Sequence, residues 1–408
     1  MIADLETMPQ LRFSGFDTPW EEGTVGTAYR LQGGYAFKSE DFTTEGVPVI
    51  RISNVTVGGI DLSGVKYHPE IRNESAFVIL NGDLLIAMSG ATTGKTCTYS
   101  LDQKAYLNQR VGLFRRLGTD HDTRFLTGYV GAKKFQDSLS SLLVAGAQPN
   151  IGSRDIESIP FAFPTLPEQR KIADFLTVVD GRIGQLSQKK ALLEDYKKGV
   201  MQQLFTQALR FKDDHGNDFP EWEEKKLGTV CRILKGKGLS KADLVEDGEI
   251  PCIRYGELYT IYSELIQETN SRTNVPEKEL VLSEENDVII PASGETHIDI
   301  ATASCVMSKG IALGGDLNII RTKLNGVFLA YYLNNACKHA IARVAQGSSV
   351  IHLYPDQLKG LSLRFPSNAE QTKIANFLTA LDRKIESVAQ QITHTQTFKK
   401  GLLQQMFV

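Results

Sequence analysis

Positions 89–96 contain the residue types of a loop that binds phosphate groups. Ser89, Thr92, Lys95 and Thr96 stand among glycines, and such loops hold phosphate oxygens with backbone N–H groups, a lysine and a hydroxyl. The nucleotide-binding pattern requires glycine where this chain has Ser89, and no helical periodicity follows Thr96. The counterpart of this segment in the second half, at 293–297, lacks the Gly-Lys pair. A structural turn and a loop that contacts DNA phosphates therefore both stay open, and nucleotide hydrolysis is the least supported interpretation.

Other motifs that could carry catalysis are absent or incomplete. Methyl transfer to a base needs an Asp/Asn-Pro-Pro-Tyr signature and a glycine-rich cofactor loop, and the sequence holds neither. The Gly-x-Gly at 236–238 predicts a turn, and Glu223-Glu224-Lys225 matches only the end of a nuclease motif. The seven histidines are dispersed without metal-ligand spacing. We therefore predict a non-catalytic protein with no cofactor and no metal.

Polar side chains that can pair with base edges lie on predicted loops in both halves. The candidates of the first half, besides those of 89–96, are Asn108, Gln109, Arg110, Gln148, Asn150 and Arg154. The candidates of the second half are Arg254, Tyr255, Ser293, His297, Lys309, Gln346, Ser348, Ser349 and His352. For any one of them, a solvated or fold-capping role is the simpler interpretation. As a set on loops that differ between two related halves, they predict surfaces that read different targets.

The composition predicts a folded protein with a local positive surface. Of the 408 residues, 41% are apolar, and the formal net charge of −3 argues against non-specific coating of DNA. Between Asn81 and Phe135, eight Lys or Arg oppose four Asp, which is compatible with one basic face. The five cysteines are scattered and predict reduced thiols. Short apolar runs and the absence of a signal-peptide pattern at the start predict a soluble, cytoplasmic protein.

The candidate residues are positioned by a duplicated chain. Residues 168–205 align without a gap on residues 370–407, and 17 of these 38 positions are identical. The same shift of 202 relates 20–22 to 222–224. The chain therefore repeats a variable segment followed by a long helical segment, and this internal symmetry indicates a target with two related parts.

Each helical repeat predicts a long amphipathic helix. A capping box opens both copies, Thr165 with Glu168 and Ser367 with Glu370: the hydroxyl accepts from a free N–H, and the glutamate reaches back to the cap residue. Apolar residues then recur at spacings of four and three, as in a coiled coil. The predicted seams are Ile172, Leu176, Val179, Ile183, Leu186, Leu193, Val200 and Leu204, and Ile374, Leu378, Leu381, Ile385, Val388, Ile392, Leu402 and Met406. A rod of about 57 Å with one apolar stripe needs a partner, and antiparallel pairing of the two copies is the simplest arrangement.

The variable segments predict mixed α/β globular domains. Three pairs of short apolar runs match between the halves, namely 47–52 with 250–255, 83–86 with 287–290, and 113–115 with 319–321. We predict globular domains at 1–164 and 206–366, and spacer helices at 165–205 and 367–408. The polar segment 206–221 is the predicted linker into the second half.

The helical repeats resemble those of the specificity subunits of type I restriction–modification systems. The first copy begins Leu166-Pro167-Glu168-Gln169-Arg170-Lys171-Ile172-Ala173 and contains Lys197-Lys198-Gly199, and the second has Glu370-Gln371 and Lys399-Lys400-Gly401. Asn368-Ala369 replaces Leu-Pro in the second copy. Leu11-Arg12-Phe13 and Phe219-Pro220-Glu221-Trp222 are also typical of the family. The resemblance covers essentially the whole chain.

The resemblance implies a DNA-reading subunit with no catalytic activity of its own. Each globular domain would be a target recognition domain that contacts one half of a split, asymmetric site in double-stranded DNA. The antiparallel helices would set the number of unread base pairs between the halves. Two modification (methyltransferase) subunits that carry S-adenosylmethionine would dock on the chain, with restriction (translocase and nuclease) subunits added. Two alternatives remain, a coiled-coil scaffold that joins two protein-binding domains and an enzyme with a degenerate phosphate loop.

Overall fold

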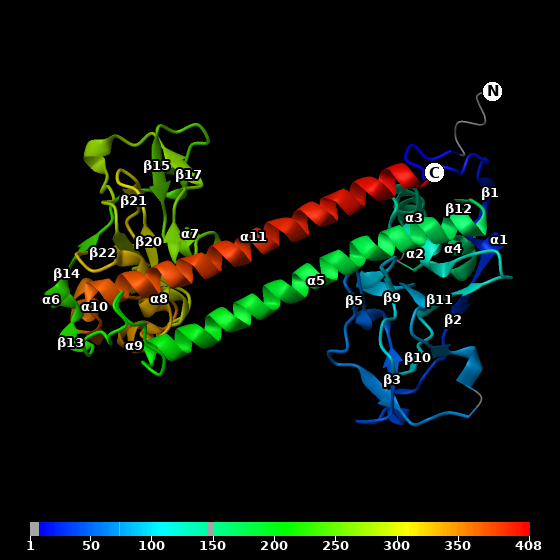
Figure 1. Ribbon diagram of the computed structural model, residues 1–408, viewed down its shortest axis with the longest axis horizontal. Helices are drawn as coiled ribbons and strands as arrows, with labels where there is room; N and C mark the ends of the chain where they lie inside the picture. The colour runs from blue at the N-terminus through cyan, green and yellow to red at the C-terminus, as the bar shows by residue number, and fades with distance from the viewer. Residues whose placement is uncertain (1–7, 73, 146–149) are drawn as a thin grey trace. The chain divides into compact units, whose positions relative to one another are not determined.

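The computed structural model describes residues 8–72, 74–145 and 150–408. The chain divides into two compact units, unit 1 with Met1–Ser187 and Ala389–Val408, and unit 2 with Gln188–Val388. Each unit therefore holds one globular domain together with a part of each long helix (Figure 1). The division passes through the helices, so the domain boundaries expected from the sequence at 164 and 366 remain predictions.

The two predicted spacer helices are present, as α5 (Leu166–Phe205) and α11 (Asn368–Met406). In unit 1 the two helices run antiparallel, because Asp180 pairs with Lys399 while Leu176 and Phe407 both pack at Gly128. In unit 2 the later part of α5 packs with the beginning of α11 in one apolar core (Figure 1). The predicted antiparallel coiled-coil pairing is confirmed within each unit.

The predicted seams are largely buried. All sixteen seam residues face the interior at least in part, and the four that are only partly buried are Ile183, Leu193, Ile385 and Ile392. Of the buried seam residues, Leu186 and Val388 lie at the middle of the helices, and the others belong to the apolar cores of the two globular domains. The apolar stripe therefore serves both helix pairing and domain attachment.

The globular domain of unit 1 is built on two four-stranded sheets. The first sheet has the order β2 (Tyr29–Gly33), β11 (Val111–Arg116), β8 (Leu84–Ala87), β9 (Thr96–Thr98). The second has the order β6 (Lys66–His68), β3 (Val47–Ile50), β10 (Ala105–Leu107), β7 (Val78–Ile79). A separate ladder pairs β1 (Glu21–Thr24) with β12 (Pro160–Phe163). The helices are α1 (Val25–Ala28), α2 (Thr123–Gly131), α3 (Lys133–Ala145) and α4 (Ser153–Glu157).

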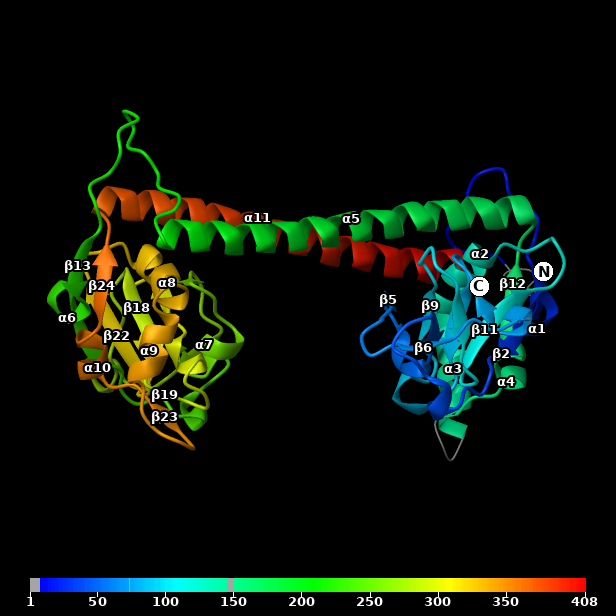
Figure 2. The same cartoon turned by 90° about the horizontal axis from the view of Figure 1, so that it is seen from below.

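Unit 2 repeats this plan. Its main sheet has the order β14 (Cys231–Lys235), β22 (Leu317–Thr322), β18 (Asp287–Pro291), β20 (Ser304–Val306), β16 (Leu265–Ile266). A second sheet joins β17 (Ser271–Thr273), β15 (Ile250–Ile253) and β21 (Ala312–Leu313), and short ladders pair β13 (Glu223–Lys226) with β24 (Ser362–Phe365) and β19 (Ser293–Gly294) with β23 (Ile351–His352). The helices are α6 (Leu227–Val230), α7 (Glu257–Thr260), α8 (Gly326–Asn334), α9 (Lys338–Val344) and α10 (Pro355–Lys359) (Figure 2). The three predicted correspondences between strands of the two halves are confirmed: β3 corresponds to β15, β8 to β18, and β11 to β22.

Alternation along β8 explains how two layers pack on one sheet. Leu84 and Ile86 point into a core shared with α2 and the long helices, whereas Leu85 and Ala87 point into a core shared with the second sheet. Successive side chains of a strand leave on opposite faces, so a continuous apolar run serves both cores. Unit 2 repeats the alternation along β18.

The start of each long helix is held by a buried arginine–glutamate pair. Arg12 donates from Nε to Glu168 Oε1 at 2.7 Å and from Nη2 to Oε2 at 2.8 Å, and this hydrogen bonding raises the pKa of Arg12. Arg210 binds Glu370 in the same way at 3.1 and 2.9 Å. The expectation that these glutamates reach back to the cap residues is therefore wrong, because both carboxylate oxygens of each are engaged by an arginine. The hydroxyl part of the prediction holds for the second copy, where Ser367 Oγ accepts from the Glu370 N–H at 3.4 Å.

The glutamine after each glutamate joins the helix to its domain. Gln169 accepts from the Asp122 N–H at 3.0 Å and donates to the Pro164 carbonyl at 2.8 Å. Gln371 accepts from the Asn325 N–H at 2.9 Å and donates to the Pro366 carbonyl at 2.9 Å. The repeated Glu-Gln pair is thus an anchor that fixes each long helix to the domain that precedes it.

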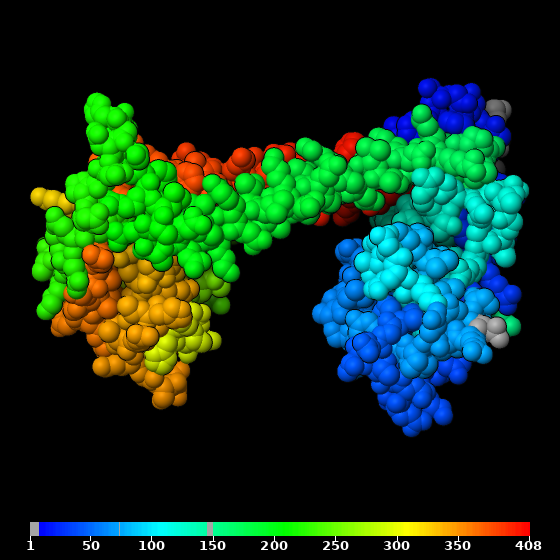
Figure 3. Space-filling model, turned by 60° about the horizontal axis from the view of Figure 1, so that its bottom comes forward, coloured from blue at the N-terminus to red at the C-terminus, as the bar shows by residue number. Residues whose placement is uncertain are grey.

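The predicted linker 206–221 stands out from the rest of unit 2 (Figures 2 and 3). Arg210 ties its start to Glu370 and also donates to the Phe219 and Pro220 carbonyls near its end. All five cysteines are free thiols, as expected. In the described part of the chain, no helix combines the length and apolar character needed to cross a bilayer.

Candidate nucleic-acid interface

In both domains, three loops meet at one edge of the sheets. In unit 1, Tyr35 after β2 donates its N–H to the Leu107 carbonyl at 2.8 Å, and Gln109 donates its N–H to the Tyr35 carbonyl at 2.9 Å. In unit 2, Lys237 after β14 donates to the Leu313 carbonyl at 3.0 Å, which is the same connection. In unit 1, the loop after β2 is therefore hydrogen-bonded to the segment that leads into β11. In unit 2, the loop after β14 is hydrogen-bonded to the segment that leads into β22.

The chain after β8 joins the same place. The Met88 N–H donates to the Arg110 carbonyl at 2.9 Å, and Ser89 forms a β-bridge with Asn150. In unit 2 the Ala292 N–H donates to the Asp316 carbonyl at 2.7 Å, and Ser293 pairs with His352. Two more loops are thus brought to the turn at 108–110 in unit 1 and at 314–316 in unit 2.

An arginine follows the parallel strand in each domain. The carbonyl of Ile50, the last residue of β3, accepts from the Asn108 N–H at 3.1 Å, and Arg51 comes next. The carbonyl of Ile253 accepts from the Gly314 N–H at 2.9 Å, and Arg254 comes next. Among the described residues, the buried Nε atoms of both arginines lack a hydrogen-bond partner.

We call these matched residues the strand-end cluster. In unit 1 it comprises Tyr35, Arg51, Ser89, Asn108, Gln109, Arg110 and Asn150. In unit 2 it comprises Lys237, Arg254, Ser293, Gly314, Gly315, Asp316 and His352. The backbone positions correspond, while most of the side chains differ.

The structure brings five of the first-half candidates together. Ser89, Asn108, Gln109, Arg110 and Asn150 belong to the cluster, where Arg110 Nη1 donates to Ser89 Oγ at 3.3 Å. Ser89 is buried, so its hydroxyl supports the loop, whereas Gln109, Arg110 and Asn150 are exposed.

The other described candidates of the first half lie on the segment 89–96 and on α4. Positions 89–96 form a turn between β8 and β9, with the Gly94 N–H donating to the Ala87 carbonyl at 2.8 Å, and a strand rather than a helix follows. Thr92 donates to the Ile52 carbonyl at 3.0 Å, Thr96 lies in β9, and the side chain of Lys95 is exposed. A phosphate-binding loop of the nucleotide-hydrolysing kind, which needs a following helix, is not formed. Arg154 is exposed on α4, and Gln148 lies outside the described residues.

In unit 2, most candidates lie in or beside the cluster. Arg254, Ser293 and His352 are members, and Gln346 forms a β-bridge with His352. Tyr255, Ser293 and Ser349 line a hollow of about 630 Å³. Ser348 and His297 are exposed on the neighbouring loops, and Lys309 is exposed on the turn after β20.

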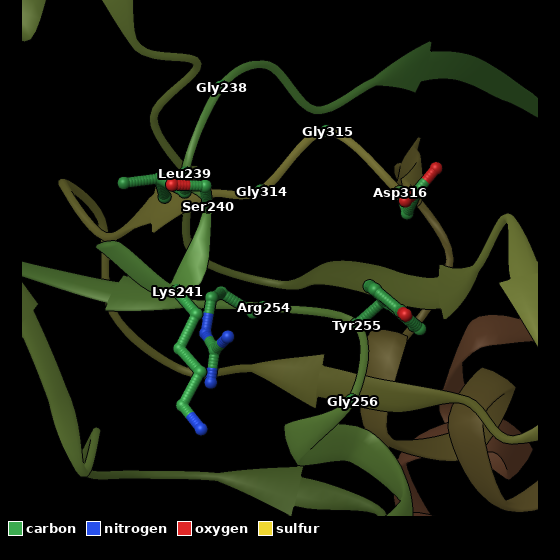
Figure 4. Close-up of a pocket in the computed structure, with 10 residues that line it drawn as sticks. All are labelled: Gly238, Leu239, Ser240, Lys241, Arg254, Tyr255, Gly256, Gly314, Gly315 and Asp316. Carbon is green, nitrogen blue, oxygen red and sulfur yellow. The ribbon is translucent and has the colours of Figure 1, made fainter. Parts of the chain in front are cut away.

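A second hollow, of about 340 Å³, lies at the cluster of unit 2 (Figure 4). Arg254 and Lys241 extend side by side on one side of it, and Asp316 and Tyr255 lie on the other side. Four glycines line it, Gly238, Gly256, Gly314 and Gly315, and the backbone of Gly238 is exposed. The hollow therefore offers cations, one carboxylate and exposed backbone groups to a ligand.

Besides the glycines Gly314 and Gly315, five residues of this edge were missed from the sequence: Tyr35, Arg51, Lys237, Lys241 and Asp316. The duplication contains the signal that finds two of them, Arg51 and Asp316. Aligning β3 with β15 places Arg51 at the position of the candidate Arg254, and aligning the turns after β10 and β21 places Asp316 at the position of Arg110.

The chemistry of the clusters is recognition by charge and hydrogen bonds. Burial, followed by nearby carboxylates, raises the pKa of Tyr259, so its hydroxyl stays protonated and donates to the Ser293 carbonyl at 2.9 Å. Over the described ranges, no group of three or more His, Cys, Asp or Glu could hold a metal ion. Guanidinium, amide, imidazole and carboxylate groups on a rigid sheet edge are the groups that read base edges and phosphates.

The chain is similar to known specificity subunits over nearly its whole length. The family model described as type I restriction modification DNA specificity domain matches residues 18–195 and 220–394. The StySPI type I restriction enzyme specificity subunit of Salmonella potsdam is 22% identical over 404 residues, which cover 94% of this chain and 87% of that protein. The MjaVIII specificity subunit of Methanocaldococcus jannaschii is 30% identical over 200 residues, which cover 48% of this chain and 47% of that protein. In fold, the S subunit of a type I restriction–modification system from M. genitalium matches with a TM-score of 0.61 and 18% identity, covering 98% of this chain and 99% of that one.

Proposed function

The chain belongs to the type I restriction–modification DNA specificity family, and from this premise we propose that its two units read the two halves of one asymmetric DNA site. The globular domain of unit 1 contacts one half-site through its strand-end cluster and the exposed Lys95 beside it. The domain of unit 2 contacts the other half-site through its own cluster.

The proposal depends on one observation: the two clusters have corresponding backbone positions, but most of these positions carry different side chains in the two units. Tyr35, Gln109 and Asn150 in unit 1 correspond to Lys237, Gly315 and His352 in unit 2. Different donors and acceptors on the same scaffold select different bases. Two such domains on one chain make the site bipartite and non-palindromic, unlike the palindromic sites read by symmetric dimers.

The long helices have two proposed roles. They keep the two domains at a set separation and so define the number of unread base pairs between the half-sites. They also offer repeated surfaces to two modification subunits, to which restriction subunits add. We propose that this chain supplies no catalytic group itself, and that methyl transfer and cleavage belong to those partners.

The decisive experiment is methylome sequencing of cells that express this chain together with its modification subunits. A single bipartite motif with two unlike halves is expected, and it should disappear when this chain is omitted while the modification subunits are kept. Methylation without such a motif, or at a palindromic one, would contradict the proposal.

Two further measurements separate the alternatives. A scaffold that joins two protein-binding domains would not retard a duplex that carries the motif in preference to one with a scrambled half. An enzyme with a degenerate phosphate loop would turn over ATP as the isolated chain. We expect sequence-dependent retardation with the modification subunits present, and no ATP turnover by the chain alone.

A further inference from the structure

Arg110 and Asp316 stand at the same place in the two domains but carry opposite charges. Arg110 is the third residue after β10, which pairs in parallel with β3. Asp316 is the third residue after β21, which pairs in parallel with β15. The Arg110 carbonyl accepts from Met88 after β8, and the Asp316 carbonyl accepts from Ala292 after β18. The backbone of this turn is therefore fixed in the same manner in both domains, and the difference lies in the side chain.

Among the residues that the structure describes, neither side chain has a strong partner in its own domain. Both residues are exposed. Arg110 makes one long hydrogen bond, 3.3 Å to Ser89 Oγ. Across the ranges that the structure describes, the Asp316 carboxylate makes no hydrogen bond or ion pair, although Arg254 and Lys241 line the same hollow (Figure 4). Both groups are thus available to a ligand.

A carboxylate without a partner at an edge that contacts DNA indicates contact with a base, because DNA phosphates repel it. Such a group contributes to binding only when it accepts a hydrogen bond from a base, and cytosine N4 is the donor that Asp and Glu read in the major groove. A guanidinium at the same place pairs with guanine O6 and N7. The repulsion also acts against sites that offer no amino group, which increases discrimination.

We propose that Arg110 and Asp316 are specificity-determining residues, each selecting one base pair in the half-site of its own unit. Arg110 reads a guanine, and Asp316 reads the amino group of a cytosine. Arg51 and Arg254, which are shared by both domains at matched positions, hold the backbone phosphates in both halves. This inference rests on the proposed function, which supplies the two half-sites.

The test replaces Arg110 or Asp316 in the full chain, co-expressed with its modification subunits, and reads the methylated motif. Arg110→Ala should make one guanine position degenerate in one half-site, with discrimination at that position reduced by about 5-fold to 150-fold. Asp316→Ala should do the same at a cytosine in the other half-site. Asp316→Asn should move the preference at that position toward adenine, because an asparagine amide pairs with adenine N6 and N7.

Two exposed residues away from the clusters serve as matched controls, Arg30→Ala in β2 of unit 1 and Asp247→Ala in unit 2. Both should leave the motif unchanged. Arg110→Lys preserves the fold and the charge but not the planar fork, so it should weaken the guanine preference; full retention of the motif would assign Arg110 to a phosphate and overturn the inference.

The outcomes distinguish the inference from the function on which it rests. A wild-type chain that produces no bipartite motif overturns both. A wild-type bipartite motif that Arg110→Ala and Asp316→Ala leave unchanged, or weaken equally at all sequences, overturns the inference alone. Degeneracy in both half-sites from one substitution also overturns it.

Discussion

Lys197 Nζ lies 2.6 Å from the Asp382 carboxylate in unit 2, and the residues related to them by the 202-residue repeat, Lys399 and Asp180, form the same ion pair at 2.6 Å in unit 1. The surroundings of the two pairs differ. Tyr331, the sixth residue of α8, donates its hydroxyl to Asp382, whereas the sixth residue of α2 is Gly128. The ion pair of unit 2 is therefore tied to its recognition domain by an additional hydrogen bond.

This difference predicts that two equivalent substitutions lower the free energy of unfolding by unequal amounts. Asp382→Asn should lower the free energy of unfolding by about 1.5–3 kcal/mol, because it weakens a charged hydrogen bond and an ion pair together. Asp180→Asn should cost less than about 1 kcal/mol, since its half-exposed pair resembles a surface salt bridge. Urea denaturation of both variants measures the difference. Equal costs would show that the tyrosine contributes nothing.

The arginine–glutamate pairs predict a large loss of stability when one partner is neutralised. Glu370→Gln leaves Arg210 without its buried counter-charge, and breaking such a pair costs about 3–5 kcal/mol. Glu221→Gln is the matched control, because Glu221 also binds Arg210 but has a side chain that is 84% exposed. The control should cost less than about 1 kcal/mol. Urea midpoints that fall equally for both variants would contradict the role of the buried clamp.

We predict that Lys95 contacts DNA in a way that does not depend on the base sequence. Its backbone is held in the turn after β8 while its side chain is exposed, so the ammonium can reach a phosphate. Lys95→Ala should weaken DNA binding to all duplexes and reduce the slope of log K against log salt by about one. The exposed Lys189 on α5 provides the control. Binding by Lys95→Ala that matches the wild type at every salt concentration would remove Lys95 from the interface.

The helices predict that the spacer of the recognised site can be changed without altering either half. One heptad inserted after Leu186, with another after its repeat equivalent Val388, keeps the apolar seam in phase. Seven residues add about 10 Å of helix, or about three base pairs of duplex. Methylome sequencing should find the same two half-sites with a longer spacer. An unchanged spacer would rule out a role of the helices in setting it.

Much of the scaffold is a local property and could be predicted. The heptad-like spacing of the seam predicts α5 and α11 because residues three and four apart share a helix face whatever the rest of the chain does. The duplication predicts matched strands, as found for β8 and β18. The capping prediction failed for Glu168 because a residue distant in sequence, Arg12, binds its carboxylate. Local patterns contain no information on such a competitor.

The sequence by itself determined the repeated scaffold, the long helices and the polar loops from which candidates could be drawn. Only the tertiary structure decided which loops meet, because that depends on the register of hydrogen bonds between distant strands. In the sequence, Asp316 is one aspartate after two glycines and was not a candidate. The structure shows that β18 and β21 place it at the position that Arg110 has in unit 1. A one-residue change in strand register would direct other side chains to this edge, so its chemistry is set by long-range pairing.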